Sequence, residues 1–110
     1  MLQDTLSILE TRLKNTGALQ GDQRGELLDL IQTLKTEISE LSKTHGEQAQ
    51  SITGYTEMSA HEATRTEKNP ELLDHSLKGL SASVAEFEKS HPKLVEVVNR
   101  ISTTLSNMGI

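Results

Sequence analysis

The stretch LLDLIQTLKTEISEL, residues 27–41, decides the fold class of this chain. Its aliphatic residues recur at alternating steps of four and three positions, which places them along one side of an α-helix. In heptad terms the isoleucines take position a and the leucines position d, an assortment that favours two-stranded packing when the partner helix is parallel. The stretch therefore predicts a coiled-coil-like seam, formed by Leu27, Ile31, Leu34, Ile38 and Leu41.

The same spacing marks further helices on both sides of this seam. Asn69-Pro70 and His91-Pro92 are start signals, because a proline in the first turn of a helix needs no hydrogen-bond donor. Short connectors between neighbouring helices are typical of helical hairpins. The predicted fold class is all-α, a coiled-coil-like bundle with a long central helix, and the predicted helices cover residues 2–15, 22–67, 70–89 and 91–108.

Residues 45–68 form the ambiguous part of the pattern. Their aliphatic stripe weakens, and Gly46 and Gly54 each cost a helix about 1 kcal/mol relative to alanine. Two alternatives stay open: one continuous helix, which we favour because no proline or Asn-Gly signal interrupts it, or a break near residue 45. We expect a single domain, 1–110, in which this polar helical extension joins an N-terminal hairpin (1–44) to a C-terminal hairpin (69–110).

Composition limits the classes of function. The chain has 110 residues, a net charge of −5, 34% apolar residues, and only one tyrosine and one phenylalanine. So few large apolar side chains predict a thin core, and we expect homodimerisation through the Leu27–Leu41 seam to complete it. The interspersed charges include no basic cluster, which argues against binding to nucleic acid or to an anionic membrane.

The absence of cysteine excludes disulfides and cysteine-ligated metal centres. No apolar run is long enough to cross a bilayer, and the first residues lack the basic-then-apolar form of a signal peptide. We therefore expect a cytoplasmic protein.

A more specific pattern occupies the C-terminal third. It combines a leucine pair that enters a helix, a helix-junction motif and a C-terminal tail. These are, in order, Leu72-Leu73, then Phe87-Glu88-x-x-His91-Pro92-x-Leu94, then Asn107-Met108-Gly109-Ile110. In these features the chain resembles a small uncharacterised bacterial family, domain of unknown function 4404. The resemblance implies a small helical protein and brings no assigned activity.

Two of these features are also candidate interaction sites. His91-Pro92 is either a partner-binding or pH-sensitive corner or, the interpretation we favour, a turn that caps and starts the last helix. The tail at residues 107–110 is either a docking segment or, again favoured, a helix C-cap with Gly109 as its terminator.

The middle segment offers the one candidate for a metal. Glu57 and His61 stand four residues apart, so one helix face presents both side chains. The spacing does not match the two-histidine zinc motif or the repeated Glu-x-x-His of di-iron bundles, and a solvated polar face is the simpler interpretation. The four histidines are 14 to 16 residues apart, which indicates different elements rather than one cluster.

No nucleophile elbow, phosphate-binding glycine loop or acid–base constellation is found, so we expect no catalytic residues and no cofactor. The sequence predicts a non-enzymatic helical module for protein–protein interaction or scaffolding, with itself and an unidentified protein as partners. The alternative is a small-ligand or metal-binding module that uses Tyr55, Glu57 and His61.

Overall fold

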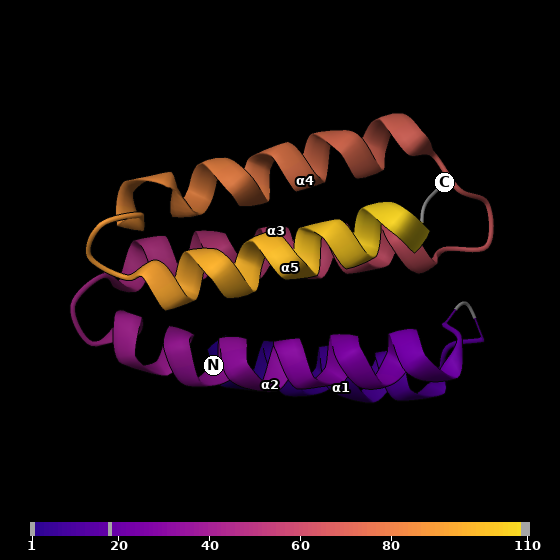
Figure 1. Cartoon of the computed structure of the whole chain (residues 1–110), viewed down its shortest axis with the longest axis horizontal. Coiled ribbons are helices and arrows are strands. Elements are labelled where there is room, and N and C mark those ends of the chain that lie inside the picture. The colour runs from indigo at the N-terminus through magenta and orange to yellow at the C-terminus, as the bar shows by residue number, and fades with distance from the viewer. Residues whose placement is uncertain (1, 18, 109–110) are drawn as a thin grey trace.

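The chain folds into an all-α bundle (Figure 1). The computed structural model describes residues 2–17 and 19–108, and within them it contains no β-strand. The elements are α1 (Leu2–Asn15), α2 (Gly21–Ser42), α3 (Gly46–Thr64), α4 (Pro70–Val84), the 3₁₀ turn η1 (Ala85–Phe87) and α5 (Pro92–Met108). None of the helices in this described part combines the length and apolarity needed to cross a membrane.

The helix favoured as continuous over residues 22–67 is in fact two helices. The peptide N–H groups of Thr44 and His45 both bond the carbonyl of Leu41, at 3.1 and 2.8 Å, and these bonds end α2. His45 then leaves helical geometry, with φ −134° and ψ 61°, and the chain reverses into α3. The prediction of one long helix is therefore wrong, whereas Gly54 lies within α3 without interrupting it.

The helix α3 occupies the centre of the bundle. It packs against each of the other four α-helices, whereas α1 has no such contact with α4 or α5. Figure 1 shows α3 behind α5, with α4 on one side and the α1–α2 pair on the other. The prediction of a polar extension over residues 45–68 is thus corrected, because most of this segment is the central helix.

Small side chains explain how a helix with so few large apolar residues comes to be buried. The buried positions of α3 are Ala49, Ile52, Thr53, Thr56, Ser59, Ala60, Glu62 and Ala63. The hydroxyls of Thr53 and Thr56 donate to the carbonyls of Ala49 and Ile52, each at 2.8 Å, so neither is buried without a partner. Small residues allow neighbouring backbones to approach closely, which a helix with four neighbours requires.

A glycine in α4 also allows α3 and α4 to pack closely. At Gly79 in α4, an added Cβ would meet three carbons of the Tyr55 ring, the farthest of them 2.8 Å away. The ring of Tyr55 therefore lies directly on the backbone of α4, where only glycine leaves room for it.

The predicted seam is buried within a single chain. All five of its side chains, Leu27 to Leu41, are at most 1% exposed. They join one core with the stripes of α1, α4 and α5. The helix α5 buries Leu94, Val97, Val98, Ile101 and Leu105 as its spacing predicts. Dimerisation through the seam would require the bundle to open, so the seam is not a free docking surface.

Candidate functional site

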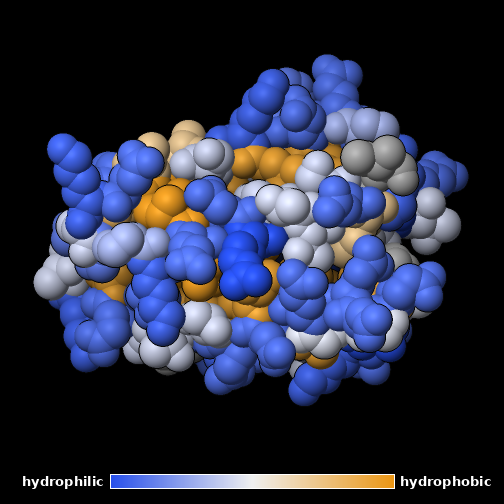
Figure 2. All heavy atoms as spheres, viewed as in Figure 1, coloured by the Kyte–Doolittle hydropathy of each residue, from blue (hydrophilic) through white to orange (hydrophobic). Residues whose placement is uncertain are grey.

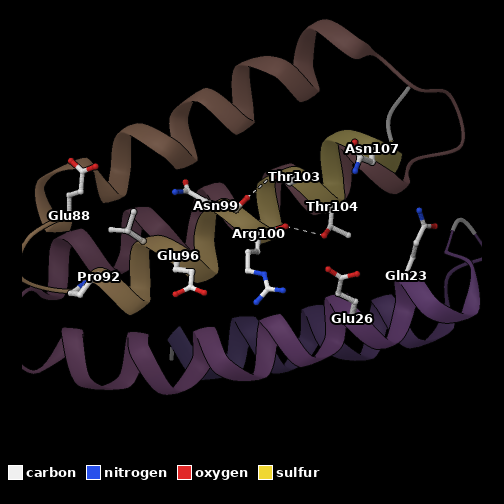
Figure 3. A pocket seen from close by; sticks show the side chains of 11 residues that line it. Gln23, Glu26, Glu88, Pro92, Glu96, Asn99, Arg100, Thr103, Thr104 and Asn107 are labelled. Atoms are coloured by element: carbon white, nitrogen blue, oxygen red, sulfur yellow. Dashed lines mark hydrogen bonds between the residues drawn. The ribbon is translucent and has the colours of Figure 1, made fainter.

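A shallow trough with a volume of about 640 Å³ runs along the outward side of α5. We call it the α5 trough. The helix α2 borders one side, and the turn after η1 borders one end (Figure 3). Its lining residues are Gln23, Glu26, Glu88, Pro92, Val95, Glu96, Asn99, Arg100, Thr103, Thr104 and Asn107. Figure 2 shows this face as hydrophilic side chains with apolar side chains visible between them.

The local sequence explains why these side chains line the trough. Burial of Leu94, Val98, Ile101 and Leu105 fixes the rotation of α5 about its axis. The exposed positions of α5 then face outward and are polar apart from Pro92, and the half-buried Val95 lies beside them. A smaller hollow of about 160 Å³ continues between α4 and α5 and shares Glu88, Val95 and Asn99 with the trough.

Arg100 stands near the middle of the trough and makes no ion pair within the described residues. It extends toward α2 between Glu96 and Glu26 (Figure 3). The other three arginines are all engaged, in contacts of Arg12 with Glu57, Arg24 with the Thr16 and Leu19 carbonyls, and Arg65 with Glu62. Arg100 is therefore the arginine that the fold leaves available to a partner.

The hydroxyl groups of the trough are held by their own helix. Thr103 donates to the carbonyl of Asn99 and Thr104 to the carbonyl of Arg100, each at 3.0 Å (Figure 3). The lining contains no histidine that could act as a general base toward either hydroxyl. The trough thus offers charges and amides for recognition, and no activated nucleophile.

The helix-junction motif is divided between the core and the surface. Phe87 and Leu94 are buried, at 2% and 0% exposure, so these two positions serve packing. Glu88 and Pro92 are exposed and line one end of the α5 trough. His91 follows the expected geometry of a joint, because its N–H bonds the Phe87 carbonyl at 2.8 Å and its carbonyl accepts from Val95 at 3.3 Å in α5.

His45, in the loop between α2 and α3, lies beside the helix-junction motif, which the spacing of the histidines did not predict. The ring centroids of His45 and His91 are 6.2 Å apart, and each lies 5.3 Å from that of Phe87. The expectation that the four histidines are scattered is therefore wrong for these two. A signal was present in the similar triplets Thr44-His45-Gly46 and Ser90-His91-Pro92, each of which ends on the first residue of a helix.

Glu57 and His61 lie on one exposed face of α3, as predicted, but with a cation beside them. Arg12 Nη1 lies 3.9 Å from Glu57 Oε2. The two residues border a hollow of about 370 Å³ together with Arg12, Gly54 and Met58. The positive charge of the Arg12 guanidinium would repel a metal ion at this position. No group of three or more candidate metal ligands is found in the described residues.

The C-terminal tail is described only in part. Asn107 lines the α5 trough and Met108 packs against the core. Gly109 and Ile110 lie outside the described residues.

Comparison with known proteins places the chain in a family. A family model described as Domain of unknown function (DUF4404) matches residues 55–110, which comprise the second half of α3 and all of α4, η1 and α5. No curated protein and no solved structure matches the chain. The α5 trough lies largely within the matched region, since only Gln23 and Glu26 precede it. The chain belongs to the family described as Domain of unknown function (DUF4404).

Proposed function

We propose that this chain is a non-enzymatic helical module that binds another protein through the α5 trough. The observation that carries the proposal is Arg100, which has no ion-pair partner among the described residues, lies in a hollow of about 640 Å³ and is flanked by carboxylates (Figure 3). Arginine is enriched among the residues that dominate protein interfaces, because it combines apolar contact with several directed hydrogen bonds.

The charges of the trough define the partner's chemistry. The lining contains three glutamates, Glu26, Glu88 and Glu96, and one cation, Arg100, so the trough carries three negative charges and one positive. A complementary segment presents one carboxylate to Arg100 and basic side chains to the glutamates. Such complementarity sets orientation and the rate of association more than raw affinity. An amphipathic helix with this charge order and a small apolar side chain over Val95 fits the open shape.

The polar groups of the trough favour binding over catalysis. The two threonine hydroxyls donate to backbone carbonyls, and the lining contains no histidine, lysine or cysteine. The alternative of a metal or small-ligand module at Glu57 and His61 has less support, because the guanidinium of Arg12 lies 3.9 Å from the Glu57 carboxylate and would repel a second cation.

Self-association is a separate question. A second copy is not needed to cover the predicted seam, because the chain covers it. We therefore propose a heterologous partner for the trough and keep homodimerisation as a prediction with no assigned surface. A bacterial cytoplasm is the setting that the family resemblance suggests for the interaction.

Site-specific photo-crosslinking tests the proposal. A photo-reactive amino acid replaces Asn99 in the trough or, as a matched control, Gln50, an exposed polar residue of α3. In cells that express the chain naturally, we expect one discrete crosslinked protein from position 99 and none from position 50. Arg100→Glu should abolish that product in the position-99 chain. Equal products from both positions, or a product that Arg100→Glu leaves unchanged, would contradict a role for the trough.

A further inference from the structure

The α2–α3 loop and the η1–α5 turn lie at the same end of the bundle (Figure 1). Each contains a histidine, and the two rings are close together. His45 lies between α2 and α3, and His91 between η1 and α5. Their rings are 6.2 Å apart between centroids, with planes 81° to each other. Phe87, buried beneath both, contacts each ring edge-on at 5.3 Å. Both histidines are only partly buried, so solvent ions reach this pair.

Each ring is held in the same way by the residue before it. Thr44 Oγ1 lies 2.7 Å from Nδ1 of His45, and Ser90 Oγ lies 2.9 Å from Nδ1 of His91. When Nδ1 carries the proton and donates to the hydroxyl oxygen, the Nε2 lone pair is free. Metal-binding histidines are commonly oriented by such a hydrogen bond from the other ring nitrogen. Neither Nε2 has a partner among the residues that the structure describes.

We propose that His45 and His91 form a two-histidine site for a divalent transition metal ion such as Zn²⁺ or Ni²⁺, bound through both Nε2 atoms. Imidazole nitrogen is a preferred ligand of these ions. A metal about 2.0–2.1 Å from Nε2 lies roughly 3 Å from the ring centroid, so two ligating rings have centroids within about 6 Å. The observed 6.2 Å is at the upper end of this range, so the two loops must bring the rings slightly closer for both Nε2 atoms to bind one ion.

The site is open, because it has two protein ligands. The described residues contain no group of three or more candidate ligands, so water fills the remaining coordination positions. The bound ion would join the α2–α3 loop to the η1–α5 turn and stabilise the end of the bundle. At Glu57 and His61, by contrast, Arg12 lies 3.9 Å from the carboxylate.

Metal titration tests the site, and the chain supplies its own controls. We would add Zn²⁺ or Ni²⁺ chloride to the purified chain and follow calorimetry and thermal unfolding, with Mg²⁺ as a reference ion that prefers oxygen ligands. We expect one ion per chain and a rise of about 5 °C in the unfolding midpoint at roughly 1 mM metal. His45→Phe, which keeps an aromatic ring on Phe87, and His91→Gln should each remove both effects.

The double variant His61→Gln/His75→Gln is the matched control, because it removes two exposed histidines outside the pair and should bind as the wild type does. Thr44→Val and Ser90→Ala should each weaken binding by about 10- to 100-fold through loss of ring orientation. Imidazole ¹⁵N spectra of the wild-type chain are independent of how any variant folds. Zinc should shift Nε2 of His45 and His91 only. No binding at 1 mM, or shifts confined to His61 or His75, would overturn the proposal.

Discussion

The helices α3 and α5 are both buried in one bundle, yet they achieve burial in opposite ways. The helix α5 inserts a stripe of long aliphatic side chains, among them Leu94, Ile101 and Leu105. The helix α3 has Ile52 as its one long aliphatic side chain in the core, and otherwise buries alanine, threonine, serine and Glu62. The helix α5 fills the space to its neighbours with large side chains. The helix α3 is surrounded by four helices, and its small side chains allow them to pack close to its backbone.

The polar atoms of α3 follow from this difference. Threonine adds little bulk, and its hydroxyl can donate to the carbonyl one turn earlier, as Thr53 and Thr56 do. Ser59 lacks such a bond, and its buried hydroxyl has no partner. The two helices should therefore respond differently to the same classes of substitution.

The largest effect is expected where α5 loses volume. Ile101 is 0% exposed, and Ile101→Ala removes apolar contact and leaves a cavity, at a cost of about 2–5 kcal/mol in unfolding free energy. Urea unfolding followed by circular dichroism measures it. Ile8→Ala, at a position 57% exposed, is the control and should cost far less. Equal losses would show that Ile101 is not in the core.

Added volume should be the damaging change in α3. Ala60 is 2% exposed, so Ala60→Leu forces the surrounding helices apart, at a cost of about 1–3 kcal/mol. Were residues 45–68 a polar extension, the same substitution would be neutral or slightly stabilising. Ala82→Leu on the exposed side of α4 serves as the control.

At the contact between α3 and α4, the effect of one substitution on stability should change sign with the residue at position 55. Gly79→Ala should destabilise by about 1–3 kcal/mol, because the new methyl group collides with the Tyr55 ring. In a Tyr55→Ala background the collision is absent, and Gly79→Ala should stabilise by about 0.5–1 kcal/mol through helix propensity. A double-mutant cycle measures the coupling. Additive effects would mean that the ring does not lie on α4.

Removal of a buried hydroxyl from α3 should change the stability by a smaller amount, which depends on whether the hydroxyl has a partner. Thr56→Val removes the hydroxyl that donates to Ile52 and should cost about 0.5–1.5 kcal/mol. Ser59→Ala removes a hydroxyl without a partner and should be neutral or stabilising. The order of the two unfolding midpoints is the check, and a reversed order would mean that Ser59 has a partner in solution.

The smallest effect on stability should come from the α5 trough. Arg100 is exposed and unpaired, so Arg100→Glu should change the unfolding free energy by less than about 0.5 kcal/mol. A large loss would assign Arg100 to the fold rather than to a partner. This measurement also makes the crosslinking experiment interpretable, because the variant must remain folded.

The same comparison explains how far the sequence could predict the structure. The stripes of α2 and α5 are long aliphatic residues at helical spacing, so their helices and buried faces follow directly. The burial of α3 does not, because alanine, threonine and serine give no apolar contrast along the chain. The break before Gly46 depends on how tightly α3 must fold back against α2, which is a tertiary effect.

The candidate sites likewise have some features that follow from local sequence and others that depend on tertiary packing. The local features of the junction at His91-Pro92 were predictable, because capping and proline chemistry are local. The neighbour of His91 was not, because His45 reaches it only through the reversal between α2 and α3. The α5 trough could have been suspected from the outward positions of α5, but its border with Glu26 requires the packing of α2.

The central position of α3 is tested most directly by native-state hydrogen exchange measured by NMR. We expect the backbone amides from Ile52 to Ala63 to exchange only through global unfolding, with a protection free energy equal to that from urea and at least as high as in α5. Exchange of these amides through a low-energy local opening, while α2 and α5 stay protected, would contradict the structure presented here.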